Sequence, residues 1–270
     1  MKSKRSLMRS AAAAPHIVWS VMFIVCPLLI ALFYAFTDAE GNFDFANILS
    51  LGKYTEIFTL SIELSVIATF VCFLVGYPLA YIIAKAKPHH QKLFVMLLML
   101  PMWTNLLIRT YSIMAILDDG GFLNRLLGTE MHIIGTKGAV IFGMVYDFLP
   151  YMVLPIYTCI SKIDKNIWEA AMDLGCNPFQ VITKTIFPLS MSGVISGITM
   201  VFVPSISTFY ISQKLGGGTF ELVGDTIERQ FVSGALNTGA SISLLMMLLI
   251  LISLGIMNKF SDADEGGMIV

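Results

Sequence analysis

Six long apolar segments divide this chain, and they decide what it can fold into. Each is long enough, at roughly 17–25 residues, to cross the hydrocarbon core of a bilayer as a helix. None alternates apolar and polar residues as a membrane β-barrel strand does, so each is expected to be helical. Charged residues make up 13% of the chain, well below the share of about a quarter in a soluble domain. The sequence therefore predicts an all-α polytopic membrane protein with spans at about 15–36, 62–84, 93–117, 138–160, 190–212 and 240–258.

The first apolar segment follows a basic stretch that contains Lys2, Lys4, Arg5 and Arg9. This arrangement is typical of a secretory signal peptide, but here the apolar core is too long and no small-residue cleavage site follows it. We therefore expect the segment to be retained as a membrane span.

Lysine and arginine are distributed unevenly among the connecting segments. They gather in the N-terminus and in the loops 85–92 and 161–189, whereas the segment 37–61 carries mainly acidic residues. Because basic loops stay on the cytoplasmic side, both termini are expected in the cytoplasm. We expect one transmembrane domain, 1–270, whose largest cytoplasmic structure is the segment 161–189.

Two short helices are predicted within this cytoplasmic segment. Asn166 precedes Glu169 by three residues, which is the spacing of a capping box and predicts a helix start. Gly175 can adopt the left-handed conformation that ends a helix. Asn177 followed by Pro178 and Gln180 predicts a second start. The segment is therefore expected to form a helix, a sharp turn and a second helix.

Residue patterns for catalysis or metal binding are missing from the sequence. It contains no Walker-type phosphate loop and no visible nucleophile–base arrangement, and its four histidines have spacings unsuited to a metal site. The four cysteines are scattered singly, as buried thiols commonly are. We expect no catalytic residue, no metal and no nucleic-acid partner. If the protein does energetic work, a partner or an ion gradient must supply the energy.

Asp147 lies within the fourth apolar segment, where a carboxylate is costly and marks a functional hypothesis. Pro150 and Pro155 follow it and are expected to distort the helix, which is tolerated where a helix lines a cavity or packs on its neighbours. With Tyr146 and Tyr151 beside it, the carboxylate could attract a cation through charge and ring faces. In the alternative, Asp147 only pairs with a polar group of a neighbouring helix.

The third apolar segment contains a second polar group. Arg109 is expected to pair with an acid on another helix or to extend outward to the membrane surface. Asn105 is expected to make an interhelical hydrogen bond, and Trp103 to pack or to line the path. The candidate substrate path comprises Asp147, Tyr146, Tyr151, Trp103 and Asn105.

The cytoplasmic segment resembles the EAA loop of permease subunits of bacterial ATP-binding-cassette importers. The residues in register with that motif are Glu169, Ala170, Ala171, Gly175 and Pro188. Two positions depart from it, because Thr185 replaces an aliphatic residue and Phe187 replaces the usual leucine.

A more specific resemblance, to the first permease of spermidine/putrescine importers, extends over all six spans. It rests on the segments 100–114, 121–124, 146–157, 204–212, 215–218 and 227–231. Many relatives carry an amide where this chain has Asp147, so the carboxylate either tunes substrate binding or is a local substitution.

The resemblance implies a type I importer permease fold in the bacterial inner membrane. It implies a second homologous permease, an ATPase dimer that binds ATP and Mg, and an extracytoplasmic polyamine-binding protein, with no cofactor in this chain. Glu169, Ala170, Ala171 and Gly175 would then form the coupling helix that docks on the ATPase.

Two other transport functions and one structural role stay open. The same architecture could carry another small solute. An ion-coupled secondary transporter using Asp147 predicts inverted repeats and uptake without an ATPase. A membrane scaffold would need neither a distorted helix nor a buried acid.

Overall fold

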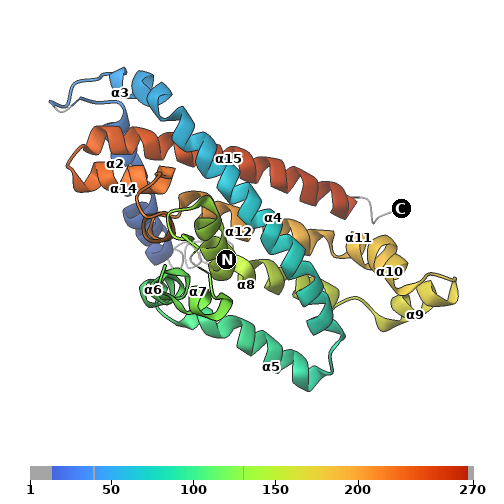
Figure 1. Ribbon diagram of the computed structural model, residues 1–270. Coiled ribbons are helices and arrows are strands. Elements are labelled where there is room, and N and C mark those ends of the chain that lie inside the picture. The colour runs from blue at the N-terminus through green and yellow to red at the C-terminus, as the bar shows by residue number, and fades with distance from the viewer. Residues whose placement is uncertain (1–13, 39, 130, 267–270) are drawn as a thin grey trace, which may run out of the picture. The chain divides into compact units, whose positions relative to one another are not determined.

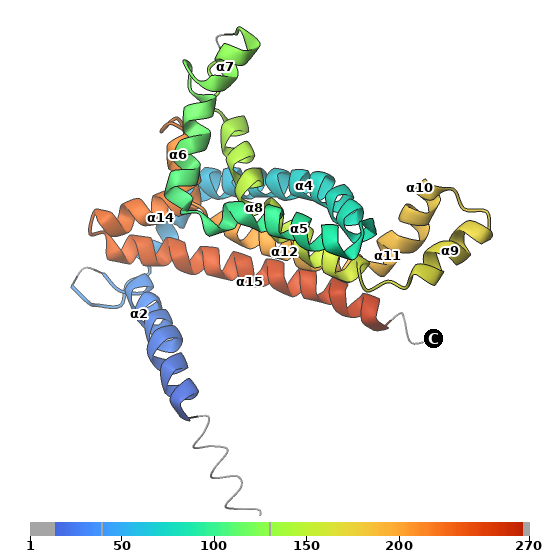
Figure 2. The ribbon, with the colours of Figure 1, turned by 90° about the horizontal axis from the view of Figure 1, so that it is seen from below.

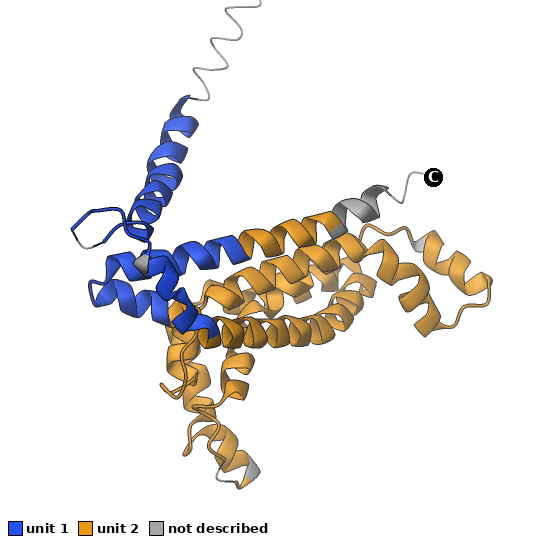
Figure 3. Cartoon of the chain, turned by 90° about the horizontal axis from the view of Figure 1, so that it is seen from above, with its two compact units in different colours: residues 1–55, 226–249 blue, residues 56–225, 250–270 orange. Residues whose placement is uncertain are grey.

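The computed structural model describes residues 14–38, 40–129 and 131–266 (Figure 1). Within these ranges the chain forms helices joined by loops, with one isolated β-bridge between Thr37 and Phe43. It divides into two compact units, residues 1–55 with 226–249 and residues 56–225 with 250–270 (Figure 3).

The first unit contains the first apolar helix, 14–35, which ends in α2 (Cys26–Ala35), then α3 (Ala46–Leu49) and the beginning of α15 (Leu236–Gly266). The last carbonyls of a helix lack intrahelical donors. Here the side-chain amide of Asn237 supplies them, because its Nδ2 donates to the carbonyls of Tyr34 at 3.2 Å and Thr37 at 2.6 Å. The hydroxyl of Ser241 donates to Ala35 O at 3.1 Å. These hydrogen bonds join the end of α2 to the start of α15.

The loop after α2 is organised by one carboxylate. Asp38 Oδ1 accepts hydrogen bonds from the backbone N–H groups of Asn42 at 2.8 Å and Glu40 at 2.9 Å. The N–H of Asn42, followed by other hydrogen-bond donors of the loop, lowers the pKa of Asp38. The loop therefore holds an ionised acid at neutral pH.

The second unit contains the helices between the two apolar ends of the chain. They are α4 (Thr55–Lys85), α5 (Pro88–Met99), α6 (Leu106–Leu117), α7 (Phe122–Leu127), α8 (Lys137–Ile160), α9 (Lys165–Asp173), α10 (Pro178–Val181), α11 (Phe187–Leu189), α12 (Met191–Ser207) and α13 (Tyr210–Leu215). The helices α14 (Val223–Val232) and α15 each contain residues of both units.

The core of the second unit is built around α8. Met152, Val153 and Ile156 are fully buried against apolar side chains of α4 and α12. The helix runs without a break from Lys137 to Ile160, through Pro150 and Pro155. The expected proline distortion therefore does not interrupt α8.

Glycines let α12 approach α8 closely. A Cβ at Gly197 would lie 2.9 Å from Met152 Sδ, and one at Gly193 would lie 2.8 Å from the carbonyl oxygen of Pro155. Both distances are shorter than real Cβ contacts, so no larger residue fits without movement. The two glycines are four residues apart and lie on one face of the helix, which is the small-residue spacing that brings membrane helices together.

The membrane-span predictions are confirmed in type and corrected in shape. Among the described residues, four helices are long and apolar enough to cross a membrane: 14–35, 47–85, 137–160 and 236–259. Two helix pairs meet the same criteria only when each pair is taken together, and they are bent by 94° between 88–103 and 106–126 and by 71° between 178–189 and 191–207.

The third and fifth predicted spans are not straight helices. The helix in the third, 93–117, ends in a 3₁₀ segment, Leu100–Trp103, and Thr104 is extended with φ −82° and ψ 152°. The helix in the fifth, 190–212, ends at Ser207, and Thr208 is extended before α13 begins. The apolar composition of a whole segment does not reveal such a break, because one extended residue changes the composition very little.

Candidate functional site

The cytoplasmic motif predicted from the sequence forms α9 and α10. Figures 1 and 2 show both helices at one end of the second unit, beyond the end of α8, while α6 and α7 lie at the other end. Gly175 between them has φ +87°, the left-handed conformation expected of it. Asn177 and Gln180 form a reciprocal capping box at the start of α10, as predicted. The helix–turn–helix is therefore present.

The predicted start of the first short helix was wrong. Asp164, not Asn166, is the N-cap of α9, and its carboxylate accepts a hydrogen bond from the backbone N–H of Asn166 at 3.0 Å. Asn166 is itself helical, so the pairing with Glu169 cannot form a capping box. Asp164 accepts a hydrogen bond from a free N–H group of the first helical turn, so the helix begins two residues earlier than predicted.

The residues in register with the EAA motif point in two directions. Ala171 is buried in the core of the second unit, and Trp168 is half-buried beside it. Glu169 and Ala170 are exposed. One face of α9 therefore holds the helix to the unit, while the other presents a carboxylate and a small side chain.

Large apolar side chains surround that exposed face. Leu174 is 86% exposed and Phe179 is 73% exposed, and Ile167 and Met172 are also exposed. A cluster of such side chains on a turn between two helices is typical of a surface that another protein covers.

The attachment of α9 to α4 is aromatic. The ring of Trp168 stacks on that of Tyr81, with centroids 5.4 Å apart. Lys85, one helical turn after Tyr81, completes the cluster. Sequence inspection does not find this cluster, because its members lie far apart in the chain and no motif contains them.

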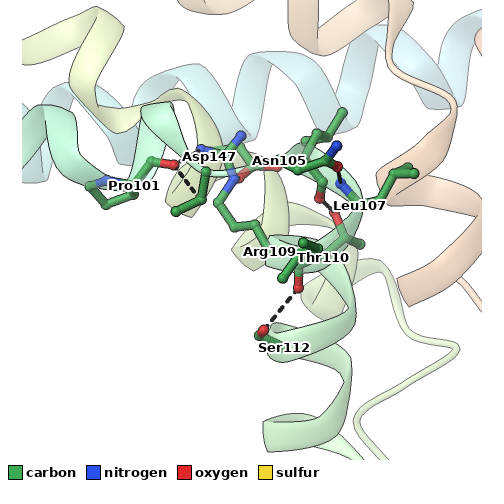
Figure 4. Close-up of polar contacts among 10 residues, drawn as sticks. Pro101, Asn105, Leu107, Arg109, Thr110, Ser112 and Asp147 are labelled. Carbon is green, nitrogen blue, oxygen red and sulfur yellow. Dashed lines mark hydrogen bonds and ion pairs between the residues drawn. The ribbon is translucent and has the colours of Figure 1, made fainter.

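The buried acid of α8 is paired. Asp147 is 2% exposed, and its Oδ1 lies 2.5 Å from Nε of Arg109 on α6 (Figure 4). Arg109 also donates from Nη1 to the carbonyl oxygen of Pro101 at 3.0 Å. The expected ion pair between Arg109 and an acid of another helix is confirmed, and the pair fixes α6 beside α8.

Asp147 and Tyr146 face different surroundings although they are adjacent in sequence. No donor among the described residues reaches Asp147 Oδ2, which is buried. Tyr146 is exposed and lines, with Arg109, Thr104 and Phe142, a cavity of about 300 Å³. The guanidinium of Arg109 thus lies between the buried acid and the cavity.

The other three candidate path residues do not join this pair. Trp103 is 70% exposed at the end of the 3₁₀ segment. Asn105 caps α6, where its side chain accepts from the N–H of Leu107 at 2.8 Å, so the expected interhelical hydrogen bond is wrong. Tyr151 is partly exposed and its ring contacts that of Phe148, with centroids 6.3 Å apart.

Among the described residues, no group of three or more histidine, cysteine, aspartate or glutamate side chains could hold a metal ion.

Comparison with known families gives one match that covers most of the chain. Residues 76–264 match the model of the binding-protein-dependent transport system inner membrane component. Among curated proteins, the spermidine/putrescine transport system permease protein PotB of Haemophilus influenzae is 36% identical over 251 residues, which is 87% of this chain and 88% of that protein. The protein of the same name from Escherichia coli K12 is 36% identical over 229 residues, 80% and 83% of the two chains.

Solved structures show the same fold at low sequence identity. A chain of a bacterial ABC transporter involved in the import of the acidic polysaccharide alginate aligns with a TM-score of 0.72 and 18% identity, over 96% of both chains. A chain of an alginate ABC transporter in complex with a pentasaccharide-bound periplasmic protein aligns with a TM-score of 0.77 and 16% identity, over 96% and 95%. At these identities the likeness establishes the fold alone.

Proposed function

This chain belongs to the family of binding-protein-dependent transport system inner membrane components, and we propose that it is the permease subunit of an ATP-driven polyamine importer. The observation that carries the substrate class is the 36% identity to permeases of spermidine/putrescine transport systems, sustained over 87% of this chain. The fold is that of ABC importer permeases, so alternating access is the expected mode of transport.

The translocation path is proposed to lie between this chain and a second, homologous permease. The first apolar helix supports this arrangement, because the residues of its most apolar window are exposed within this chain. Lipid and a neighbouring subunit are the two surroundings that can cover such a surface. An extracytoplasmic binding protein would deliver the substrate to the outer end of the path.

Energy is proposed to enter through α9 and the turn that follows it. Their exposed side includes Glu169, which can pair with basic groups or with a helix N-terminus of an ATPase. Leu174 and Phe179 add apolar area to the same surface. ATP and Mg would be bound by that ATPase partner, since this sequence has no phosphate loop. In this proposal both termini of the chain lie, with α9, on the cytoplasmic side.

The candidate substrate path would recognise a cation mainly through aromatic rings. Asp147 is neutralised by Arg109, so the pair contributes little net charge to the path. Tyr146, Tyr151 and Trp103 are exposed. Ring faces attract ammonium groups without requiring a particular distance between the charges of the substrate. The path would therefore accept amines of more than one length.

Reconstitution of the transporter tests the proposal. This chain would be purified with its partner permease, ATPases and binding protein, and placed in vesicles with labelled spermidine, putrescine and a neutral oligosaccharide. Polyamine uptake that needs ATP and survives collapse of the proton gradient is expected. Uptake of the oligosaccharide but not of the polyamines would show that the substrate is a different class of solute. Polyamine uptake that stops when the proton gradient collapses, with ATP still present, would identify a secondary transporter.

A further inference from the structure

A second aromatic cluster lies away from the candidate path residues, between α6 and α13. Nζ of Lys214 lies 5.4 Å from the ring centroid of Tyr111 and 5.8 Å from that of Tyr210. The two rings meet edge to face, with centroids 6.4 Å apart and an angle of 82° between their planes. One ammonium group therefore lies within the range of cation–π attraction to two rings at once.

Within the described part of the chain, the ammonium of Lys214 is not paired with a carboxylate. The ion pairs found among the described residues do not include Lys214, although its side chain is half-buried. A cation that leaves bulk water without an opposite charge must be compensated by other groups. Here the rings of Tyr111 and Tyr210, together with a hydrogen bond between Lys214 and the hydroxyl of Tyr111, supply the compensation.

The rings are held more firmly than the amine. On α13, Ile211 and Leu215 are buried on either side of Lys214 and pack in the core of the second unit. On α6, Thr110 and Ile113 are buried on either side of Tyr111. By contrast, Lys214 ends in a flexible four-carbon stem. The amine can therefore leave while the two rings stay in place.

The chemistry of this arrangement matches a polyamine. The lysine side chain is an aminobutyl group, four methylenes that end in an ammonium, and putrescine and one end of spermidine contain the same group. Tyr111 is 50% exposed, so its ring is accessible within this chain. We propose that Tyr111 and Tyr210 form a cation site for a substrate ammonium, and that Lys214 occupies this site until substrate displaces it.

Displacement exchanges one ammonium for another on the same rings, so the site does not stay empty between transport cycles. Lys214 then acts as a tethered competitor, and its removal strengthens substrate binding. Removal of a ring weakens it. This proposal rests on the proposed function, because it takes the substrate to be a polyamine, which contains the same aminobutyl group as lysine.

Equilibrium binding of labelled spermidine to the purified complex of permeases and ATPases, without the binding protein, tests the site. Lys214→Met is expected to lower the Kd about threefold to tenfold, and Tyr111→Leu to raise it by a similar factor. Tyr111→Phe keeps the ring but lacks the hydroxyl that hydrogen-bonds to Lys214, and it is expected to change the Kd less than Tyr111→Leu does. In the double variant, Tyr111→Leu removes the gain from Lys214→Met, because the freed site no longer has both rings.

Lys137→Met is the control, since it removes one exposed lysine charge, which lies 3.7 Å from a carboxylate oxygen of Glu63, at another place in the second unit. Equal effects of Lys214→Met and Lys137→Met, or a gain that survives in the double variant, would overturn the cation site. Uptake by the unaltered transporter in vesicles separates the two failures. If the transporter takes up polyamines but the ring variants bind spermidine with an unchanged Kd, only the cation site is contradicted. If the transporter takes up no polyamine, the proposed function is contradicted.

Discussion

The indole ring of Trp168 on α9 lies nearly parallel to the phenol ring of Tyr81 on α4, with centroids 5.4 Å apart and 19° between their planes. Nζ of Lys85 lies 4.8 Å from the first centroid and 5.0 Å from the second. This cluster joins the proposed coupling helix to the end of a membrane span. A displacement of α9 by an ATPase is therefore expected to move α4 with it.

Trp168→Leu is expected to loosen this joint while the exposed face of α9 stays intact. A stacked pair contributes about 0.5–1.5 kcal/mol beyond burial, and the cation adds a similar amount. The ATPase should remain associated, but less spermidine should enter for each ATP hydrolysed. The measurement is this ratio in vesicles. Trp168→Phe keeps a ring against Tyr81 and serves as the control, and an unchanged ratio in Trp168→Leu would exclude the joint as the route of coupling.

Glu169→Lys tests the other face of α9. Because Glu169 is exposed, reversing its charge should leave the fold intact and weaken association with the ATPase, with loss of uptake. Co-purification of the ATPase measures this directly. Glu56→Lys makes the same charge change at an exposed position at the start of α4 and is expected to have no effect. Equal ATPase recovery from both variants would contradict the docking role.

Local rules in the sequence identified the turn after α9 correctly. Gly175 and the capping box of Asn177 depend only on neighbouring residues, so they could be predicted. The start of α9 could not be fixed in the same way, because Asp164 and Asn166 are both capable caps and the choice depends on where the chain leaves α8. The break at Thr104 was missed for a different reason, since the segment 93–117 taken as a whole is as apolar as a straight span.

Pairs between distant helices were the part of the site that the sequence could not supply. The cost of a charge in a membrane singled out Asp147 and made Arg109 a candidate for an ion pair, but it did not join the two. The contact of Lys214 with two tyrosine rings left no signal at all, because single aromatic residues are common in membrane spans. Helix packing determines both contacts.

Arg109→Met is expected to destabilise the second unit, because it leaves Asp147 buried without its partner. Breaking a buried ion pair from one side costs about 3–5 kcal/mol, whereas neutralising both members costs much less. Addition of Asp147→Asn should therefore restore most of the lost stability. Thermal unfolding of the purified complex, with uptake measured in parallel, checks this order. If the double variant is less stable than Arg109→Met alone, the pair does not hold the two helices together.

Asn237→Leu is expected to destabilise the first unit, where the amide donates to carbonyls at the end of α2. The substitution keeps the side-chain size but removes the amide hydrogen bonds to both carbonyls, at a cost of about 1–3 kcal/mol. Limited proteolysis at the loop after α2 measures the effect, and cleavage should be faster. Asn47→Leu removes a single weaker hydrogen bond to Thr37 O, at 3.2 Å, and is expected to have a smaller effect. Equal cleavage rates would show that Asn237 does not secure this end.

Gly197→Val is expected to separate α12 from α8. A Cβ at this position would lie 2.9 Å from Met152 Sδ and 3.0 Å from the carbonyl oxygen of Met152, and the carbonyl cannot move aside without shifting α8. Overpacking of this kind costs about 1–3 kcal/mol or more. Ser196→Val is the control, because it adds a branched side chain one residue earlier on an exposed face of the same helix. Folded yield in detergent and the unfolding temperature of the complex should fall for Gly197→Val alone. Since α12 and α8 form the core on which Ala171 of α9 packs, coupled uptake should fall with stability, and retention of both would mean that the two helices do not need this close approach.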